Sequence, residues 1–541
     1  MKHKLIELFR ELSETIDYLK GFEPGFDIPK VEGHGDFATN AAMMLAKKTG
    51  KNPRLIAEEI KNAIKTPSDF IEKVEIAGPG FLNFFINPLY FSKIIVEIKD
   101  KNEKFGYFDF NKGKRANVEF VSANPTGPLT VGHGRNAVCG DTIANILERT
   151  GFEVDREYYF NNAGRQMRTL GNSVKLRYLQ LLGNEIEFPD DHYQGEYIKD
   201  IAQKLIDRYG NSLVDDNSTV FKDTAEESIF EEIKATLLRL GITHSIFFNE
   251  NTLYEDGSIE DCLNKFEALG LSFKSEGAVW LKLSEMGKEK DKVIVKSTGE
   301  PTYRLPDIAY HIKKLERKYD LVIDIFGADH IDTYPDVIAS VSALGLEGEK
   351  IKVLIHQFVT ILQNGEVVKM STRKANFITL DELIDWVGSD VVRYFFNMRS
   401  IQTHMNFDLD LAKKQSDENP VFYLQYAHAR ICSILRLAEE QSIKAGYTNL
   451  HLLNAPEELK LLKKLHQYRD IIHRAATTLD AVVICTYLEE LAGLFHRFYT
   501  VCRIIGSGKE LEEARTALVI AVKFVLKDGL TLLGLTAPER M

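Results

Sequence analysis

The 541-residue sequence contains no apolar run that approaches the ~20 residues needed to cross a bilayer. No internal repeat or low-complexity stretch is present either. The first ten residues mix Lys, His and Glu with apolar positions, so we expect no secretory signal. With 44% hydrophobic and 27% charged residues, the composition is that of an ordinary globular protein, and the length suits three or four domains.

Cysteine is scarce and widely spaced. The five cysteines include no Cys-x-x-Cys pair; they are Cys139, Cys262, Cys432, Cys485 and Cys502. This spacing supports neither a disulfide framework nor a sulfur-ligated zinc site, so we expect no structural zinc. A reducing cytoplasm fits such a chain best.

The sequence also lacks an excess of basic residues. Its 68 Lys and Arg face 79 Asp and Glu, for a net charge of −11, which argues against non-specific nucleic-acid binding. An RNA partner stays open, because phosphate contacts need only a local basic patch. Composition alone therefore leaves the function undecided.

The order of the predicted elements divides the chain into three parts. Residues 1–112 indicate a small α+β unit, with a glycine-rich turn at 33–36 followed by a helix and two strands. Strand–helix alternation over residues 113–400 implies a doubly wound, parallel α/β sheet. Residues 165–275, mostly helical and charged, are predicted to interrupt this sheet as an insertion. Residues 401–541 are predicted to form a C-terminal helical bundle.

Five segments are predicted as strands of the parallel sheet: Ala116–Ser122, Glu153–Phe160, Lys292–Lys296, Leu321–Phe326 and Ile351–Phe358. A hairpin is predicted after the last strand, because Asn364-Gly365 lies between two apolar runs.

A glycine-rich turn follows the first predicted strand, with the sequence Thr130-Val131-Gly132-His133-Gly134. Ligands of open α/β sheets bind beyond the carboxyl ends of the strands, where the free N–H groups of a helix N-terminus suit phosphate. Glycines at 132 and 134 would let a nucleotide approach the backbone, and His133 would donate to a phosphate or to the bridging oxygen. A purely structural turn is the alternative, and this motif alone does not separate the two.

A second motif follows the predicted hairpin, with the sequence Lys369-Met370-Ser371-Thr372-Arg373-Lys374. Three cations in six residues would clamp a polyphosphate leaving group, a role that strengthens as negative charge develops. The alternative is a solvated basic turn, which the run taken alone favours.

The pair of motifs is far more specific than either one. Together they resemble the HIGH and KMSKS signatures of class I aminoacyl-tRNA synthetases, with Thr130 in place of the first histidine and Thr372 in place of the second lysine. Arg373 or Lys374 would substitute for that lysine. The resemblance implies catalytic roles for Thr130, His133, Lys369, Ser371 and Arg373. It implies ATP contacts for Thr130, Gly132, His133, Gly134, Lys369, Met370 and Ser371.

Longer stretches resemble the arginyl-tRNA synthetases: residues 119–136, 158–166, 301–310 and 535–541. The resemblance covers the chain end to end and implies an N-terminal added domain, a catalytic domain and an anticodon-binding bundle. A tyrosine and an aspartate that grip the guanidinium in that family match Tyr303 and Asp307, and a carboxylate can pair bidentately with a guanidinium. Alternatively, Tyr303 packs and Asp307 caps a helix. The other residues expected to bind arginine are Glu119, Ser122, Asn124, His133 and Asp329.

Basic residues gather on one C-terminal stretch and are predicted to bind tRNA: Lys460, Lys463, Lys464, Arg469 and Arg474. Spacings of three and four put several of them on one helix face, although a solvated face is the alternative. Three tyrosines are candidates either to stack on anticodon bases or to fill the core of the bundle: Tyr423, Tyr426 and Tyr468. A weaker candidate for a tRNA contact is the N-terminal run Lys47, Lys48, Lys51 and Arg54.

The resemblance implies a two-step reaction. ATP activates L-arginine to arginyl-adenylate, and arginine then passes to the 3′-terminal adenosine of tRNA(Arg), with release of AMP and pyrophosphate. Mg²⁺ would accompany ATP without a protein metal site of its own, and activation would require bound tRNA. We also expect a cytoplasmic monomer with no membrane association.

Three other functions are weighed against this one: another class I synthetase such as glutamyl, a nucleotidyltransferase of the same fold, and a non-catalytic RNA-binding paralogue. The carboxyl groups of Asp307 and Glu119 suit a cationic amino acid better than glutamate. A nucleotidyltransferase would leave the helical bundle without a role. The two departures from the signature motifs keep the third alternative open.

Overall fold

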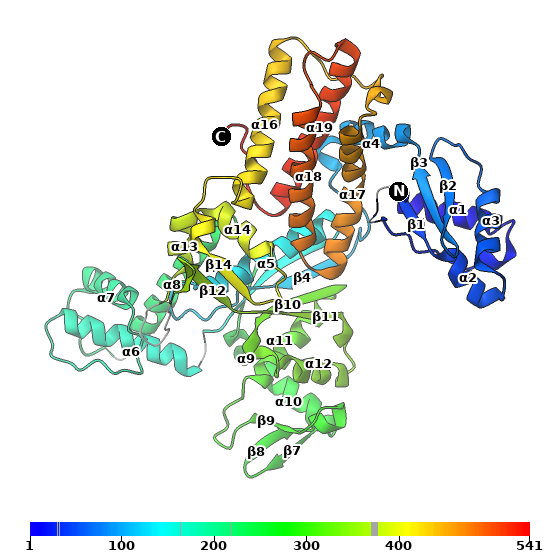
Figure 1. Ribbon diagram of the computed structural model, residues 1–541. Coiled ribbons are helices and arrows are strands. Elements are labelled where there is room, and N and C mark those ends of the chain that lie inside the picture. Colours follow the sequence, from blue (N-terminus) through cyan, green and yellow to red (C-terminus); the bar gives the residue numbers. More distant parts are fainter. Residues whose placement is uncertain (30, 32, 163, 217, 369–376) are drawn as a thin grey trace.

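The computed structural model describes residues 1–29, 31, 33–162, 164–216, 218–368 and 377–541. Figure 1 shows a central sheet with a helical bundle on one side of it. A small N-terminal unit lies at one flank of the molecule and a helical projection at the other.

The N-terminal unit joins a three-stranded antiparallel sheet, of order β1-β3-β2, to helices. Two of its helices begin with an Asn-Pro pair, at Asn52 and Asn87, whose side chains accept hydrogen bonds from N–H groups of the first turn. Its elements are α1 (Lys2–Leu12), β1 (Phe37–Thr39), α2 (Ala41–Thr49), α3 (Pro53–Ala63), β2 (Ile71–Ala77), β3 (Phe81–Ile86) and α4 (Pro88–Lys101).

The central sheet has five parallel strands in the order β11-β10-β4-β5-β6, so the predicted parallel α/β architecture is confirmed. Its strands are β4 (Arg115–Glu119), β5 (Glu153–Phe160), β6 (Ile246–Asn249), β10 (Leu321–Gly327) and β11 (Ile351–His356). Helix α5 (Val131–Arg149) packs on one face of this sheet, and α11 (Arg304–Glu316) with α12 (Tyr334–Ala343) lies on the other.

Two predictions about this sheet are wrong. Residues 165–275 are not a continuous insertion, because β6 returns to the sheet and pairs with β5 after α6 (Gly164–Leu181), α7 (Glu196–Tyr209) and α8 (Val220–Arg239). The segment at 292–296 does not belong to it either. It forms β9 (Lys292–Val295) of a separate antiparallel sheet with β7 (Ser272–Ser275) and β8 (Ala278–Leu281), after α9 (Asn251–Glu255) and α10 (Ser258–Ala268). A short apolar run predicts a strand but not its partner.

The predicted hairpin is confirmed as β12 (Val359–Gln363) and β13 (Glu366–Val367). Both turn residues have positive φ, 52° at Asn364 and 75° at Gly365, which is the conformation that Asn-Gly favours. Strand β12 also pairs in parallel with β14 (Met405–Asp408). Helices α13 (Leu380–Val387), α14 (Ser389–Asn397) and α15 (Leu409–Ala412) lie on either side of β14 in the sequence.

The C-terminal part contains four long helices, as predicted: α16 (Pro420–Glu440), α17 (Pro456–Thr478), α18 (Val482–Val501) and α19 (Lys509–Leu532). The bundle stands on the α5 side of the sheet, and α17 also packs against α4 of the N-terminal unit. The three parts of the chain therefore meet around α17.

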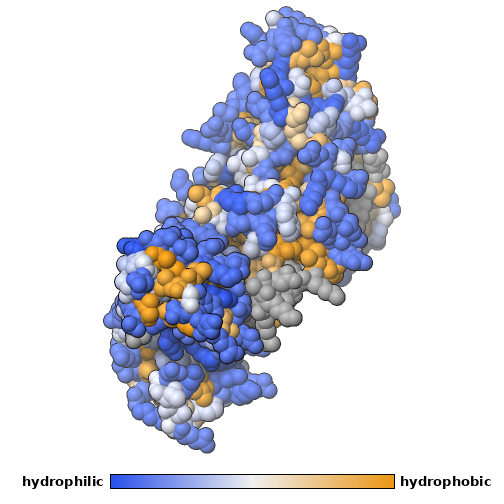
Figure 2. Space-filling model, turned by 90° about the vertical axis from the view of Figure 1, so that its left-hand side faces the viewer, coloured by the Kyte–Doolittle hydropathy of each residue, from blue (hydrophilic) through white to orange (hydrophobic). Residues whose placement is uncertain are grey.

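The face that carries the helical projection is largely hydrophilic, and its hydrophobic areas are separated from one another (Figure 2). Among the described residues, no helix has the length and apolar composition that a membrane crossing requires.

Candidate active site

The chain turns sharply where β4 ends. Val121 and Ser122 both have positive φ, 67° and 38°, which is rare for residues other than glycine and indicates a strained turn held by its surroundings. Asn136 of α5 fixes this turn, because its side chain accepts from the Val121 N–H at 2.8 Å and donates to the Ile325 carbonyl of β10 at 2.9 Å. Ser122 Oγ donates to Glu119 at 2.9 Å and accepts from the Tyr159 N–H at 3.0 Å. The end of β4 is thus tied to both neighbouring strands.

Helix α5 begins at the first predicted motif, where Thr130 and His133 form a reciprocal cap. The Thr130 N–H donates to His133 Nδ1 at 3.2 Å, so Nδ1 is the unprotonated nitrogen and Nε2 carries the proton. Burial, and then the nearby charge of His356, lower the pKa of His133 to about 4. His133 is therefore a neutral side chain at neutral pH, with an Nε2–H group that bonds to no described residue and can donate to a ligand.

The two glycines of this turn have different roles. A Cβ placed at Gly132 would meet only Thr130 Oγ1, at 3.7 Å, so the helix start remains open to a ligand. A Cβ at Gly134 would lie 2.5 Å from Leu380 Cδ1, which is a clash. Gly134 therefore serves the packing of α13 on α5, and its predicted contact with ATP stays a prediction.

The second predicted motif, with the expected site residues Lys369, Met370, Ser371 and Arg373, lies outside the described residues. The chain that follows it returns to the first motif. Thr379 forms a β-bridge with Thr130, and the Leu380 N–H donates to the Leu129 carbonyl at 2.8 Å. The segment after residues 369–376 is thus held at the start of α5.

Arg135 makes a second link between α5 and the hairpin region. Its buried guanidinium donates to the carbonyls of Gln357 and Thr403 at 2.9 Å and of Ser400 at 2.7 Å. Gln357 precedes β12, and the other two carbonyls precede β14, the strand that pairs with β12. Three charge-assisted hydrogen bonds fix the hairpin against the helix that carries His133.

A carboxyl group without a partner lies in the first turn of α11. No hydrogen bond or ion pair joins the half-buried Asp307 carboxylate to a described residue. Burial raises the pKa of Asp307 to about 6, and the charges of Glu119 and Asp324 act in the same direction, against those of His311 and His330. A cationic ligand would relieve this cost, since an opposite charge favours the ionised form.

Glu250, just beyond β6, lies close enough to Asp307 for the two charges to interact. Burial raises the pKa of Glu250, and the charge of Asp307 adds to that effect. Hydroxyl groups stabilise Glu250 from two sides, one of them Tyr159 Oη at 2.9 Å and the other that of Tyr254. Asp307 and Glu250 place two negative charges close together on this side of the sheet, an arrangement suited to a cation, and we call the site around them the acidic pocket.

A network of buried charges lies beneath that pocket. Lys314 Nζ contacts Glu119 Oε2 and Asp324 Oδ1, both at 2.5 Å, and the Tyr310 hydroxyl lies 3.0 Å from carboxylate oxygens of Glu119 and Glu157. Glu119 also accepts from Ser122, so both of its oxygens are engaged within the protein.

The other predicted arginine-binding residues are spread around this pocket. Tyr303, one turn before Asp307, has an 80% exposed side chain and so is not packed over the carboxylate. The Asn124 amide, in the loop that follows β4, donates to Gln166 Oε1 at 2.9 Å. The backbone of Asp329 lies in the short 3₁₀ helix Ala328–His330, and its side chain lies outside the described part of the structure.

Sequence reasoning missed the buried network and the two residues that lock the first motif. The missed residues are Arg135, Asn136, Glu157, Glu250, Tyr310, His311, Lys314 and Asp324. One signal was available. His311 and Lys314 follow Asp307 by four and seven residues, so all three share one face of a helix whose other inward positions are apolar.

The five basic residues of α17 that are predicted to bind tRNA differ in exposure and in their partners. Lys463 pairs with Asp36 of the N-terminal unit at 2.5 Å, and the buried Lys464 pairs with Glu490 of α18. Arg469 lies over the ring of Phe110 at 5.0 Å. The prediction that Lys464 contacts tRNA is wrong, because the packing of α18 removes its side chain from the surface. Lys460, half-buried, and Arg474, exposed, lie on the same helix.

The three candidate tyrosines of the bundle also differ from one another. Tyr468 is buried and belongs to the core, where its hydroxyl donates to Asp528. Tyr423 and Tyr426 are half-buried and both approach His496 of α18, at 5.0 and 6.2 Å between ring centroids. Tyr426 belongs to a group of partly exposed side chains from α16 and α18 that we call the aromatic–arginine cluster: Phe422, Tyr426, Arg430, His496 and Tyr499.

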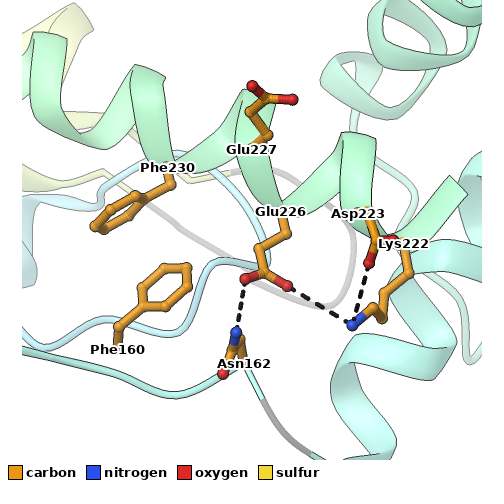
Figure 3. Close-up of a pocket in the computed structure, with 7 residues that line it drawn as sticks. All are labelled: Phe160, Asn162, Lys222, Asp223, Glu226, Glu227 and Phe230. Carbon is orange, nitrogen blue, oxygen red and sulfur yellow. Dashed lines mark hydrogen bonds and ion pairs between the residues drawn. The ribbon is translucent and has the colours of Figure 1, made fainter. Parts of the chain in front are cut away.

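A cavity of about 350 Å³ lies on the other face of β5 and includes none of the predicted site residues. Figure 3 shows four of its polar side chains in one chain of contacts: Glu226 accepts from the Asn162 amide at 2.7 Å and pairs with Lys222 at 3.9 Å, and Lys222 pairs with Asp223 at 3.3 Å. Phe160 and Phe230 form its apolar wall, with ring centroids 4.2 Å apart. Alternate residues of β5 point to opposite faces, so Phe160 faces this cavity and Tyr159 faces the acidic pocket.

The fold and this site define a class I aminoacyl-tRNA synthetase. A parallel sheet carries a Thr-Val-Gly-His turn at the carboxyl end of its central strand. The segments that precede and follow the Lys-Met-Ser motif in the sequence are anchored at that turn, through Arg135 and Thr379.

Comparisons with known proteins identify the amino acid. The family model of the "Arginyl tRNA synthetase N terminal domain" matches residues 3–86, that of "tRNA synthetases class I (R), catalytic domain" matches 100–393, and that of the "DALR anticodon binding domain" matches 424–541. The arginine–tRNA ligase of Desulfotalea psychrophila is 49% identical over 519 residues, 95% of this chain and 94% of that protein. The ligase of Chlorobium phaeovibrioides is 47% identical over 553 residues, 99% and 100% of the two chains. The fold matches Thermus thermophilus arginyl-tRNA synthetase with a TM-score of 0.79 at 21% identity, over 100% of both chains. The chain belongs to the arginyl-tRNA synthetase family.

Proposed function

We propose a division of labour among the residues of this arginine–tRNA ligase. The enzyme uses ATP to convert L-arginine to arginyl-adenylate and transfers the arginine to the 3′-terminal adenosine of tRNA, with release of AMP and pyrophosphate. No covalent enzyme intermediate is required, so the residues contribute by positioning and by stabilising charge.

Asp307 holds the guanidinium group of arginine. The observation that carries this assignment is its half-buried carboxylate, which has a raised pKa and bonds to no described residue. A planar guanidinium supplies the missing charge and two parallel N–H donors. Glu250, with Tyr159 and Tyr254 fixed around it, adds a second negative charge to the pocket. Tyr303, whose ring is exposed one turn earlier on α11, is free to cover the bound side chain.

Glu119, Ser122 and Asn124 form the end of the pocket nearest to the sheet. Glu119 and Ser122 are fixed to each other and to the neighbouring elements, and they shape the wall at the strained turn. The exposed amide of Asn124 is available to the α-amino or carboxylate end of arginine. Asp329 stays a predicted contact to arginine.

His133 and Thr130 serve the phosphates of ATP. Because Nδ1 of His133 accepts from the Thr130 backbone, its Nε2–H is directed away from the cap and can donate to a phosphate oxygen of ATP. Because the pKa of His133 is about 4, the side chain stays neutral and keeps its Nε2–H donor throughout the physiological pH range. Gly132 leaves room for the nucleotide. Lys369, Ser371 and Arg373 would stabilise the leaving pyrophosphate, and Mg²⁺ would be held mainly by phosphates and water.

The outer face of the bundle meets the anticodon loop of tRNA(Arg) through the aromatic–arginine cluster. Partly exposed rings and a guanidinium stacked on Tyr426 and Tyr499, at 5.0 and 5.1 Å, offer the flat surfaces on which unpaired bases stack. Lys47 and Lys48, exposed at the end of α2, are candidates to contact the tRNA elbow. Lys51 and Arg54 are weaker candidates, because each already approaches a glutamate of α3.

Three further expectations stay predictions: the division of the chain at residues 112/113 and 400/401, a monomeric state and a cytoplasmic location.

ATP–pyrophosphate exchange tests this function directly. Purified protein is assayed with arginine and with each other amino acid, in the presence and absence of tRNA(Arg). We expect exchange with arginine only, and a large increase when tRNA is added. Exchange supported by another amino acid would overturn the assignment of the acidic pocket to arginine. Exchange that is equally fast without tRNA would overturn only the predicted tRNA requirement.

A further inference from the structure

Lys314 lies on α11 two turns beyond Asp307, and no part of its side chain is exposed. Its ammonium group bridges Glu119 of β4 and Asp324 of β10, at 2.5 Å from each. Burial alone would lower the pKa of Lys314, but the charges of Asp324, Glu119 and Glu157 outweigh burial and raise the pKa above its ordinary value. Lys314 is therefore permanently charged at working pH.

His311 is a second cation of this face. Its Nδ1 lies 2.7 Å from the Asp307 carbonyl and its Nε2 lies 3.0 Å from Asp324 Oδ2. A backbone carbonyl only accepts, and so does an ionised carboxylate, so both ring nitrogens must carry protons. The pKa of His311 is raised accordingly, because Asp324 outweighs the effect of burial. Lys314 and His311 in turn outweigh burial at Asp324 and hold the pKa of that carboxyl well below its usual value.

The charges packed around Lys314 balance. Three carboxylates, one each from β4, β5 and β10, meet three cations, two from α11 and one from its C-cap residue. Arg317 Nη2 pairs with Glu157 at 2.9 Å, and the uncharged Tyr310 hydroxyl bridges Glu119 and Glu157. The carboxylates are Glu119, Glu157 and Asp324, and the cations are His311, Lys314 and Arg317. This balance leaves Asp307 and Glu250 as the pocket carboxylates that no described cation pairs with.

We propose that Lys314 is the internal counter-cation of the arginine pocket: it neutralises Glu119 and Asp324, so that the charge available to the substrate resides on Asp307 and Glu250. Lys314 touches no substrate and is a positioning residue that acts through these carboxylates. The proposal rests on the proposed role of Asp307 in binding the guanidinium.

The proposal predicts how arginine binding responds to pH. Without Lys314, Glu119 and Asp324 are buried without the cation they share, and burial then favours uptake of a proton by the pair. Arginine that enters the pocket brings a positive charge close to the protonated pair and displaces that proton. The affinity for arginine therefore increases with pH above neutrality in the variant, but not in the wild-type enzyme.

The experiment measures the KM for arginine at pH 6.5, 7.5 and 8.5, in aminoacylation with saturating ATP and tRNA. The enzymes are wild type, Lys314→Met and Lys314→Arg. The ratio of variant to wild-type KM cancels the titration of the substrate itself. We expect this ratio for Lys314→Met to fall as pH rises, by up to about tenfold per unit, since one proton is released per arginine bound. Lys314→Arg keeps the charge, so its ratio should not change with pH.

Lys464 offers a matched control. It is also a buried lysine paired with a glutamate, but it lies in the bundle, away from the pocket. Lys464→Met should lower the melting temperature and leave the KM ratio constant with pH. A constant ratio for Lys314→Met as well would mean that Lys314 has only a structural role, and the proposal would be wrong. Lys314→Gln gives the same measurement if the methionine variant does not fold.

Two further results separate this proposal from the proposed function. If Asp307→Asn leaves the KM for arginine unchanged, the pocket assignment itself fails. If Asp307→Asn raises the KM but Lys314→Met shows no dependence on pH, only the counter-cation proposal fails. A wild-type KM that already falls steeply between pH 7.5 and 8.5, beyond the titration of free arginine, would also overturn it, because the charges around Lys314 would then not be balanced.

Discussion

Helices α11 and α17 both carry many charged residues, but they use them differently. On α11, the buried cations match the buried carboxylates and one acid, Asp307, is left over at the edge of the pocket. On α17, Lys463 and Lys464 are each matched by an acid of a neighbouring element. An unmatched charge is available to a ligand, whereas a matched one holds two parts of the protein together.

The difference follows from what packs against each helix. Charged groups near Asp307 come from α11 itself, from the short helix Ala328–His330 and from β4 and β10, and none of them forms an ion pair with its carboxylate in the described part of the structure. Helix α17 lies between α18 and the N-terminal unit, so its charges meet Glu490 and Asp36 before they can meet RNA. Charge density in the sequence does not distinguish these two situations; the arrangement of neighbouring elements does.

The largest expected effect comes from removing the unmatched charge on α11. Asp307→Asn should raise the KM for arginine by about a hundredfold or more, because a charge-assisted bidentate pair in a half-buried site is lost. The KM for ATP should change less than threefold. Asp307→Glu keeps the charge but displaces it, so its KM for arginine should lie between those of the wild type and Asp307→Asn.

The melting temperature of Asp307→Asn separates a loss of arginine binding from misfolding. The folded-state pKa of Asp307, about 6, lies above its ordinary value, so ionisation of Asp307 costs stability as pH rises from about 4 to 6. Asp307→Asn should therefore melt no lower than wild type at pH 7.5. A variant that melts much lower, with an unchanged KM, would mean that Asp307 serves the fold and not the substrate.

A smaller effect is expected from pH alone. Because the neutral form of Asp307 dominates below its pKa of about 6, arginine must displace a proton there. The KM for arginine should rise by about fivefold between pH 6 and pH 5 and be nearly flat from 7 to 8. The KM for ATP, measured over the same range, is the control. In Asp307→Asn the rise should disappear; if it persists, the titrating group is Glu250, whose pKa is also raised by burial.

Much of this architecture could be predicted from the sequence. β5 has the predicted limits, the Asn-Gly hairpin is present, and the start of α5 follows from Thr130, whose side chain caps the helix. These features depend on neighbours in the sequence. The pairing of β6 with β5, and the transfer of β9 to a separate sheet, depend on residues far away in the chain, and short apolar runs carry no information about them.

The same distinction holds for the site. Thr130 and His133 contact one another because they are three residues apart on a helix start, and Asp307 was found through a resemblance. Asp324 and Glu119 meet Lys314 only because three separate elements converge. Periodicity places Lys463 and Lys464 on α17, but it does not show that Asp36 and Glu490 pack against them.

The next prediction, with an expected effect of the same order as that of pH, concerns the surface of the bundle proposed to bind RNA. Arg430→Ala should raise the KM for tRNA by about tenfold and leave the KM for arginine unchanged, because the guanidinium that lies over Tyr426 and Tyr499 is lost from the aromatic–arginine cluster. The control is Arg436→Ala on the same helix, where the guanidinium donates to the Glu539 carbonyl at 3.2 Å. Equal effects of the two substitutions would indicate a general loss of positive charge, and the cluster would have no special role.

The smallest effect is expected at the junction of α17 with the N-terminal unit. Lys463→Ala should change the KM for tRNA less than twofold and lower the free energy of unfolding by about 0.5–1 kcal/mol, since its partly exposed pair with Asp36 is lost. Asp36→Asn keeps an acceptor for the Ile86 N–H, so it removes the charge with little change to the turn. A double-mutant cycle of these two substitutions should give a coupling energy of the same size. A coupling near zero, together with a tenfold rise in the KM for tRNA, would restore Lys463 to the RNA-binding surface and remove the contrast between the two helices.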